Sequence, residues 1–585
     1  MRFNKLSQLF SNLEGTTKRL EMIDLISNFF GEIRESKDFE DLDKIIYLLQ
    51  GQLAPNIHQF PKMGLAEKMI IEALSIHSGV NTKRIREVLI KRGDIGAAAE
   101  LILSRKKKQT SLIDYSENID SSKDSLDIFE LYSELKKIAQ SEGSGSHDTK
   151  LGILRGIIRR CSPLETKYLL RIITSTLRVG VQSPTIIEGL ASAFTGHKEN
   201  KPYLERAYTL YPDLGDIAKI LAEKGLEEVK KIDIKYGIPI LSMLASREVF
   251  TEFLNRLGSP FVAEYKLDGE RLQIHKTGDD IILFSRRLLD ISEQYPDVCQ
   301  VIRENIKTEN VIFEGEVVAM DPFYEKMLPF QVLSQRRRKY DVENLTKEVP
   351  VCLFVFDLLK LGDESYINKP LPKRREKLEE IIDERDELRL VQSVLINSTE
   401  ELLDFFNKAR EEGTEGIMAK SISEDSIYQA GNRGYKWLKL KSLEGGKLKD
   451  TIDVVLVGAF YGKGRRTGVY GTYIGAVYDP EKNLFIAFTR FFSGLTDELS
   501  ESLTKDMKEY IIERKPKDVI CEDKPDLWLK PEVVMEITGD EITISDKFAS
   551  LGYSLRFPVF LRLRPEKGPK DITTVDEIKE LYETQ

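Results

Sequence analysis

The stretch Glu264-Tyr265-Lys266-Leu267-Asp268-Gly269-Glu270-Arg271 places a lysine just ahead of an Asp-Gly turn signal. Asp-Gly is a common hairpin turn, so residues 266–269 taken alone also fit an ordinary strand end. A lysine amine can attack the α-phosphorus of a nucleoside triphosphate only when it is unprotonated, in line and surrounded by cations that neutralise the phosphates. The interpretation of Lys266 as a nucleophile therefore depends on the partners that the downstream sequence supplies.

Residues 311–321 are typical of a buried strand with two glutamates on one face. Alternation places Glu314 and Glu316 side by side, with Phe313 and Gly315 on the opposite face. Two neighbouring carboxylates on an apolar strand are costly to bury uncompensated, which predicts a nearby cation or a pair of sugar hydroxyls. A solvated face is the alternative, because glutamate is usually exposed.

An aromatic ring is supplied by residues 352–359, an apolar segment typical of a strand. Phe354 and Phe356 share one face there, and either ring could stack on a purine. A core position is the simpler interpretation of a phenylalanine considered by itself.

Cations gather in residues 437–441, which alternate so that Trp437, Lys439 and Lys441 share a face if the segment is a strand. Arg433 adds a further cation just upstream. A phosphate site explains all of these charges, whereas an edge strand with a polar outer face is the alternative.

Residues 415–420 follow a Gly413-Thr414 turn signal. Strict alternation would put Glu415 and Lys420 on opposite faces of a strand. Either Glu415 precedes the strand or a bulge intervenes, and the sequence leaves both possibilities open.

Taken in order, these segments resemble the motifs of the covalent nucleotidyltransferases, and within them the ATP-dependent DNA ligases of the archaeal and eukaryotic replicative type. The residues that carry the resemblance are 266–271, 285–287, 313–316, 354–357, 415–420 and 437–441. The resemblance implies an enzyme that seals 5′-phosphate/3′-hydroxyl nicks in double-stranded DNA through a lysyl-AMP intermediate and a DNA-adenylate. It also implies a place in DNA replication, repair and recombination.

The same resemblance implies a role for individual residues. Lys266 would form the lysyl-AMP phosphoramidate, Glu264 would meet the adenine, and Phe356 would stack on the base. Arg271 and Glu316 would hold the ribose. The residues expected to handle phosphates are Arg286, Arg433, Lys439 and Lys441. The implied cofactors are ATP and Mg²⁺ or Mn²⁺, and the carboxylates expected nearest to the metal are Asp268, Glu316 and Glu415.

The C-terminal part, from residue 450, is a series of short β runs separated by glycines and charges. This pattern is typical of a small β-barrel, and the resemblance implies an OB-fold. Residues 462–468 (Gly-Lys-Gly-Arg-Arg-Thr-Gly) are expected to form a basic turn suited to a phosphate backbone, with a solvated hairpin tip as the alternative.

Residues 556–567 resemble the last motif of the family, which orients the pyrophosphate leaving group. The residues that would do so here are Arg562, Arg564 and Lys567. The chain departs from many relatives at Val559, where they have a basic residue, and at Glu566, where they have aspartate. It also departs at residues 240–245 (Ile-Leu-Ser-Met-Leu-Ala), where many read Arg-Pro-Met-Leu-Ala.

The N-terminal third is rich in helical patterns and almost free of strand alternation, which predicts an all-helical domain. The resemblance implies that this domain embraces DNA. The charge run 104–108 is typical of a solvated loop, and it leads into Gln109, Leu112 and Tyr115. These three fit the Gln-x-x-aliphatic-x-x-aromatic pattern of a peptide that binds a sliding clamp such as PCNA, although chance matches are common.

A chain of 585 residues is too long to fold around one hydrophobic core, so we expect several domains. The expected domains are an all-α DNA-binding domain (1–230), an α+β adenylation core (231–445) and a C-terminal OB-fold β-barrel (446–585). The net charge of −9 argues against a uniformly basic DNA binder, yet 87 Lys and Arg residues allow local basic surfaces.

The four cysteines lack Cys-x-x-Cys spacing, so we expect reduced core residues and no zinc site. No apolar run is long enough for a membrane span, and the N-terminus lacks the core of a secretion signal. We therefore expect an intracellular, cytoplasmic protein, and we expect it to act as a monomer.

Two other functions remain open. An RNA ligase or a capping enzyme would share the core and barrel, but the long helical region ahead of Lys266 argues against both. A non-catalytic adaptor between DNA and a sliding clamp is disfavoured by the intact segment 266–271.

Overall fold

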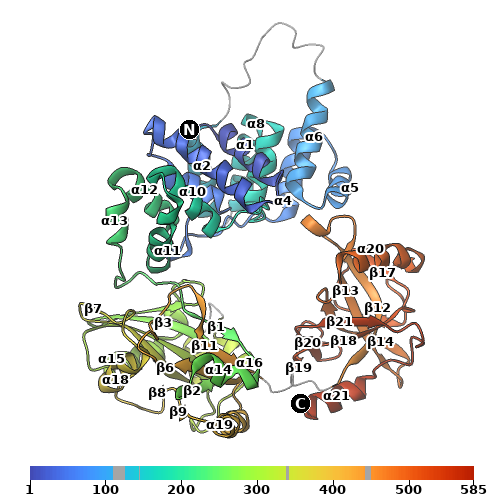
Figure 1. Ribbon diagram of the computed structural model, residues 1–585. Helices are drawn as coiled ribbons and strands as arrows, with labels where there is room; N and C mark the ends of the chain where they lie inside the picture. Colours follow the sequence, from blue (N-terminus) through green and yellow to red (C-terminus); the bar gives the residue numbers. More distant parts are fainter. Residues whose placement is uncertain (110–125, 144, 338–341, 442–449, 585) are drawn as a thin grey trace. The chain divides into compact units, whose positions relative to one another are not determined.

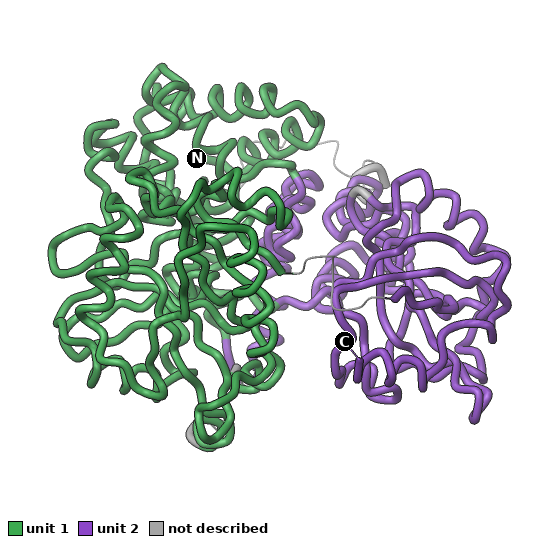
Figure 2. Tube along the Cα trace, turned by 60° about the horizontal axis from the view of Figure 1, so that its bottom comes forward, with its two compact units in different colours: residues 1–64, 126–141, 179–443 green, residues 65–125, 142–178, 444–585 purple. Residues whose placement is uncertain are grey.

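The structure is a computed structural model that describes residues 1–109, 126–143, 145–337, 342–441 and 450–584 (Figure 1). The chain divides into two compact units, shown in Figure 2. Unit 1 comprises residues 1–64, 126–141 and 179–443, and unit 2 comprises residues 65–125, 142–178 and 444–585. The helical N-terminal region thus contributes to both units.

The described residues up to Lys230 form helices and no β-strand, which confirms the expected helical region. The helices in unit 1 are α1 (Phe3–Glu14), α2 (Arg19–Ser36), α3 (Leu42–Leu49), α7 (Ile128–Gln140), α10 (Ser183–Thr195), α11 (Lys201–Leu210), α12 (Leu214–Lys224) and α13 (Leu226–Lys230). Those in unit 2 are α4 (Glu67–Ser78), α5 (Thr82–Arg92), α6 (Ile95–Gln109), α8 (Ser146–Arg160) and α9 (Pro163–Ile173). Their start signals are local: Ser162 and Glu165 form a reciprocal capping box at the start of α9.

The loop expected at residues 104–108 is not there, because α6 continues through the charge run to Gln109. Lys and Arg are good helix formers, and α6 already buries Ala98, Ala99 and Ile102, so the helix extends where the charges alone suggested a loop. Gln109 ends the helix. Leu112 and Tyr115 of the expected clamp-binding peptide lie outside the described residues.

The core of unit 1 contains two mixed β-sheets. The first has the order β1 (Leu244–Arg247), β11 (Arg433–Leu440), β10 (Gly416–Ser421), β2 (Phe261–Lys266) and β9 (Ser393–Ile396). The second has the order β4 (Asp280–Ser285), β3 (Glu270–Thr277), β5 (Asn310–Ala319), β6 (Val351–Leu361) and β7 (Glu364–Ser365), with β8 (Leu388–Leu390) parallel to β6.

Helices pack on both sheets and supply their cores (Figure 1). On the first sheet lie α14 (Phe253–Leu257) and α19 (Thr399–Glu411), and on the second lie α15 (Pro296–Asn305) and α18 (Leu371–Ile381). The remaining short helices of the core are α16 (Phe330–Leu333) and α17 (Val342–Glu348).

The segment 264–271 carries the chain from the first sheet to the second. Its β2 half ends at Lys266 and its β3 half begins at Glu270, so Asp268-Gly269 joins two sheets and does not close a hairpin. A Cβ on Gly269 would stand 2.3 Å from the carbonyl oxygen of Val317, which is closer than real Cβ atoms approach backbone. Glycine at this position therefore lets the crossover lie against β5.

The C-terminal part of unit 2 is strand-rich, in agreement with the short β runs expected from residue 450 onward. Its main sheet has the order β15 (Ile511–Ile512), β17 (Leu527–Leu529), β12 (Ile452–Tyr461), β13 (Tyr470–Asp479), β14 (Leu484–Phe491) and β16 (Val519–Ile520). The other strands and helices are β18 (Val534–Thr538), which pairs with β12 and with β21 (Val559–Leu563), then β19 (Glu541–Ile544), β20 (Tyr553–Arg556), α20 (Asp497–Asp506) and α21 (Val575–Thr584).

Strand β12 is buried on both faces, since Val454 and Leu456 join one hydrophobic cluster and Val455 and Val457 join another. The basic segment 462–468 lies between β12 and β13, as its glycines predicted. Among the described residues, no helix has both the length and the apolar character needed to cross a membrane.

Candidate active site

A cavity of about 800 Å³ opens among residues of both core sheets of unit 1. Residues from β1, β2, β3, β6, β10 and β11 contribute to its wall. The predicted site residues that line it are Glu264, Lys266, Arg271, Arg286, Glu316, Phe356, Arg433 and Lys439. Positions separated by more than 150 residues in the sequence thus meet at one cavity, as the order of the motifs led us to expect.

Lys266 is held by a carboxylate at the edge of this cavity. Its Nζ lies 2.5 Å from Oε2 of Glu415, and the Nζ of Lys441 lies 3.0 Å from the same oxygen. Burial opposes the charge on Glu415, but Lys266 and then Lys441 lower the pKa of Glu415 to about 2. The three predicted residues therefore form one ion-paired group.

The structure also decides the placement of Glu415, which the sequence left open. Strand β10 begins at Gly416, which pairs with Lys266 of β2, so Glu415 precedes the strand. The backbone N–H of Glu415 donates to the carbonyl oxygen of Lys266 at 2.8 Å. This bond and the side-chain ion pair fix Glu415 beside the expected nucleophile.

The predicted phosphate-binding cations lie within electrostatic reach of one another. Burial lowers the pKa of Lys439, and the positive charges of Lys266, Lys441, Arg433 and Arg286 lower it further. Like charges held this close are stabilised by a bound anion, so the group favours a polyphosphate.

Glu316 lies within electrostatic reach of Lys266 and Arg271. Burial raises the pKa of Glu316 to about 7, against the opposing effect of Lys266 and Arg271, while Glu415 and Asp268 raise it further. Among the described side chains no group of three or more His, Cys, Asp or Glu residues is arranged to hold a metal by itself. Mg²⁺ commonly takes one or two carboxylates together with water and substrate phosphates, so Glu316 and Asp268 fit that ion in the presence of a nucleotide.

Glu264 has partners that the sequence motifs did not assign. Its carboxylate is paired with Arg375 of α18, and its Oε2 lies 2.6 Å from Nζ of Lys420. Lys420 in turn lies over the rings of Phe356 and Trp437, at 4.8 and 4.3 Å from their centroids. A lysine on a buried strand was the available signal for Lys420, whereas nothing near Arg375 in the sequence marked it.

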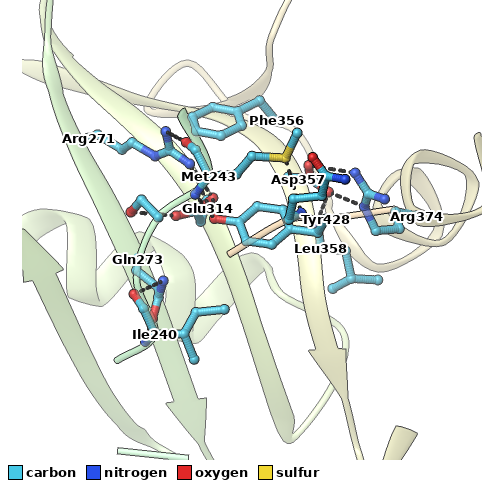
Figure 3. Close-up of polar contacts among 12 residues, drawn as sticks. Ile240, Met243, Arg271, Gln273, Glu314, Phe356, Asp357, Leu358, Arg374 and Tyr428 are labelled. Carbon is cyan, nitrogen blue, oxygen red and sulfur yellow. Dashed lines mark hydrogen bonds and ion pairs between the residues drawn. The ribbon is translucent and has the colours of Figure 1, made fainter. Parts of the chain in front are cut away.

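Arg271 lines the cavity and belongs to a buried polar network (Figure 3). Its Nη2 donates to Oε2 of Glu314 at 2.6 Å, and its Nη1 donates to the main-chain oxygen of Met243 at 2.9 Å. Burial opposes the charge of Arg271, but Glu314 and then Tyr428 raise its pKa above the usual value. The cation expected beside Glu314 is thus present, and the solvated-face alternative is wrong for this glutamate, which is fully buried.

The residues of the last motif form an ion-pair cluster within unit 2. Nη1 of Arg564 lies 3.0 Å from Glu536 and 3.3 Å from Asp453, and Nζ of Lys567 lies 2.5 Å from Asp453. Arg562 pairs with Glu536 at 2.5 Å and remains largely exposed. Glu566, where many relatives have aspartate, pairs with Arg564 at 2.6 Å.

Three family models match the chain. The model for the DNA ligase N terminus matches residues 2–191, the ATP dependent DNA ligase domain matches residues 242–441, and the ATP dependent DNA ligase C terminal region matches residues 466–567. The fold and the lysine-containing cavity thus coincide with the middle model.

Curated relatives match over the whole chain. The DNA ligase of Hyperthermus butylicus is 42% identical and that of Sulfolobus acidocaldarius 41% identical, each over 100% of this chain and 98% of the relative. The solved structure named Pmar-Lig_Pre covers 96% of this chain and 99% of its own, with a TM-score of 0.58 at 18% identity, and shares the fold. The fold is that of an ATP-dependent ligase core with a flanking helical region and a strand-rich C-terminal part. The chain belongs to the ATP-dependent DNA ligase family.

Proposed function

We propose that this enzyme seals nicks in double-stranded DNA through AMP carried on Lys266. The observation that carries the proposal is the position of Lys266, ion-paired at a cavity where basic, acidic and aromatic residues converge. In the first step the amine of Lys266 displaces pyrophosphate from ATP, which forms a P–N bond. AMP then passes to a DNA 5′-phosphate, and the neighbouring 3′-hydroxyl displaces it. Neither the RNA ligase or capping alternative nor the adaptor is favoured by the relatives.

The residues around Lys266 act by positioning and charge neutralisation, which is what in-line displacement at phosphorus demands. Phe356 stacks on the adenine and Glu264 meets its polar edge, using the lone pairs that Arg375 and Lys420 leave available. Arg271 and Glu316 hold the ribose. The residues that neutralise phosphates are Arg286, Arg433, Lys439 and Lys441.

A divalent ion, Mg²⁺ or Mn²⁺, supplies further neutralisation of the phosphate oxygens when it is bound. Asp268 and Glu316 are the carboxylates that would hold it, with Glu415 close by and already paired with Lys266 and Lys441. Glu415 keeps the amine of Lys266 directed toward the cavity, since the contact at 2.5 Å fixes the end of the side chain.

The last-motif residues of the C-terminal domain assist only the first step in this proposal. Arg562, Arg564 and Lys567 would orient the departing pyrophosphate, and to do so they exchange some of their contacts with Glu536 and Asp453 for phosphate oxygens. The basic turn 462–468 would follow the DNA backbone. The expected division into domains 1–230, 231–445 and 446–585 is part of the same proposal.

The proposed partners are nicked DNA and a sliding clamp, with the enzyme acting as a cytoplasmic monomer. Gln109, Leu112 and Tyr115 would form the clamp-binding peptide. Replacing Gln109 and Tyr115 by alanine should abolish binding to the clamp and leave nick sealing without the clamp unchanged. A double variant that still binds the clamp with wild-type affinity would exclude this peptide.

Parallel assays of nicked DNA and nicked RNA test the substrate class. We expect sealing of nicked DNA with 5′-phosphate and 3′-hydroxyl ends, ATP consumption, and transient DNA-adenylate. Preferential sealing of RNA would instead favour the RNA ligase alternative.

A further inference from the structure

Two of the three guanidinium nitrogens of Arg271 are fixed by neighbours. Nη1 donates to the main-chain oxygen of Met243 and Nη2 donates to Glu314 (Figure 3). Because a guanidinium is planar, two such bonds fix its plane and its direction. Within the part of the chain that the structure describes, the remaining nitrogen, Nε of Arg271, is buried and has no hydrogen-bond partner. A guanidinium has five N–H donors, and the bonds to Met243, Glu314 and the hydroxyl of Tyr428 use three of them. The Nε–H is therefore one of the two donors of this cavity-lining residue that remain for a ligand.

Glu314 is fully buried, and donors on several segments hold its carboxylate. Oε1 accepts from the hydroxyl of Ser242 at 3.1 Å, and Oε2 accepts from Arg271 at 2.6 Å and from the hydroxyl of Tyr428 at 2.7 Å. A buried carboxylate needs such partners, and here they also determine which way it faces.

The hydroxyl of Tyr428 completes the network. It accepts the N–H of Met243 at 2.9 Å and donates its single proton to Glu314. Burial and then the charge of Glu314 raise the pKa of Tyr428 well above its usual value, so the proton stays on the hydroxyl.

The ring of Tyr428 is also fixed in place. It packs edge-on against Trp437, with centroids 5.9 Å apart, and the guanidinium of Arg374 lies 6.0 Å from its centroid. Arg374 is itself fully buried and bonded to Asp357 at 2.6 Å. Neither Tyr428 nor Glu314 lines the cavity, but Tyr428 touches two residues that do: its ring packs on Trp437, and its hydroxyl accepts from Nη2 of Arg271 at 3.4 Å. Removing the hydroxyl alone leaves the ring contact in place, so we expect its effect on a nucleotide to pass through Arg271.

We propose that Tyr428 and Glu314 are positioning residues that hold the guanidinium of Arg271 so that its Nε–H is the donor offered to the ribose of the bound nucleotide. The inference rests on the proposed function, in which Arg271 meets the ribose, and it adds the residues that set the geometry of that contact. Met243 takes part in this network through its main chain, whereas Ser242, which belongs to the departing segment 240–245, contributes its hydroxyl to Glu314.

The test is single-turnover adenylylation of the full-length enzyme with ATP, 2′-deoxy-ATP and 3′-deoxy-ATP. The Arg271→Ala variant identifies which ribose hydroxyl Arg271 contacts. For that hydroxyl, the deoxy analogue should label Arg271→Ala as well as ATP does, but should label the wild type less well than ATP does. Tyr428→Phe should raise the ATP concentration for half-maximal rate about tenfold and reduce the preference for ATP over that analogue, with the maximal rate changing less.

Tyr236→Phe is the matched control. The hydroxyl of Tyr236 donates to the main-chain oxygen of Gly362 at 2.7 Å, and its ring packs on the hydrophobic cluster that contains Tyr428. The Tyr236→Phe substitution removes a comparable hydrogen bond without touching Arg271. Its dependence on ATP concentration and its preference between ATP and the analogues should therefore match the wild type.

In an Arg271→Ala background, Tyr428→Phe should have no further effect on nucleotide preference. Equal losses for ATP and both analogues, additive effects in the double variant, or wild-type behaviour of Tyr428→Phe would each overturn the inference. If Tyr428→Phe is too unstable to assay, Glu314→Gln is judged by the same criteria. Failure of the proposed function is distinguishable, because the wild-type enzyme would then acquire no AMP from any nucleotide.

Discussion

Glu264 and Lys266 point to the same side of β2, and residues at or beside β10 neutralise both. Lys266 pairs with Glu415, which precedes β10, and Glu264 pairs with Lys420 inside β10. The proposed adenine contact Glu264 and the proposed nucleophile Lys266 are therefore both fixed by one pair of strands. Removing one partner of such a pair lowers the free energy of unfolding strongly, because the other charge stays partly buried without its partner.

The alternation of β11 supports a prediction for Lys439. This residue lines the cavity among other cations, whereas Lys436 on the same strand pairs with Asp425 away from it. Lys439→Ala should reduce the rate of adenylylation by roughly 10²-fold, the usual effect of removing one group that stabilises developing phosphate charge. Lys436→Ala should stay within a few-fold of wild type. Equal effects of both variants in single-turnover labelling would contradict the phosphate site.

His275 gives a prediction about stability and pH. The N–H of Gly237 donates to its Nδ1 at 3.0 Å, so the proton sits on Nε2, which lies 3.1 Å from Oε1 of Gln273. Burial lowers the pKa of His275 to about 3. Below pH 6.5 the unfolded chain therefore binds a proton that the folded chain does not, and stability is lost as pH falls from there toward 3.

At pH 5 this loss from His275 should amount to roughly 2 kcal/mol. Chemical denaturation at pH 7.5 and pH 5 measures it, and His275→Gln should show a smaller drop between the two conditions. His147→Gln is the control, since His147 is mostly exposed. A drop in His275→Gln as large as in the wild type would contradict the buried neutral histidine.

The junction between β2 and β10 decides the geometry of the site at the scale of elements. Gly416 has φ of 139°, and a Cβ there would stand 2.1 Å from the carbonyl oxygen of Leu440 on β11. Only glycine lets β10 start this close to β11, and that start holds Glu415 beside Lys266. The alternation in the sequence could not show this, because Glu415 stands just outside the strand.

Gly416→Ala should therefore destabilise the protein by more than about 2 kcal/mol and slow adenylylation, since it combines backbone strain with a clash. Gly413→Ala is the comparison: its φ is 84°, but nothing lies within 4 Å of the added Cβ. It should cost about 1 kcal/mol and leave adenylylation nearly intact. Thermal unfolding and single-turnover labelling measure both, and a Gly416→Ala enzyme as stable as Gly413→Ala would contradict the close approach.

Most of the candidate site could be predicted because its residues lie on short strands with strong alternation. Period two alone put Trp437 and Lys439 on one face of β11, and both line the cavity, as Glu316 of β5 does. Glu314 was placed beside a cation as expected, but it lies outside the cavity lining. Arg375 could not be found in this way, since it reaches Glu264 from a helix that begins more than 100 residues downstream. The continuation of α6 through residues 104–108 was missed because charge runs occur in both loops and helices.

At the scale of the whole molecule, the chain combines a net charge of −9 with basic residues concentrated at particular surfaces. The cavity collects cations, and the turn 462–468 adds others in unit 2. Composition alone could not reveal this distribution, because it depends on which segments the fold brings together. Family models covering all three parts of the chain agree with the expected order of helical, mixed and strand-rich regions.

Binding to nicked DNA should accordingly weaken steeply with added salt, because phosphate contacts release counterions. Fluorescence anisotropy of a labelled nicked duplex, measured at salt concentrations from about 50 to about 200 mM, gives the slope of binding affinity against salt concentration. The Lys266→Ala variant should show a similar salt dependence of binding to the nick, because Lys266 is one of many basic side chains. A flat salt response would contradict phosphate-dominated binding.

The most direct test of the central claim is peptide mass spectrometry of the enzyme after incubation with ATP and Mg²⁺ or Mn²⁺. The account predicts one AMP per chain, attached to Lys266, and a folded Lys266→Ala variant with no attached nucleotide. AMP on another residue, continued labelling of Lys266→Ala, or an unmodified wild-type enzyme with every divalent ion would contradict it.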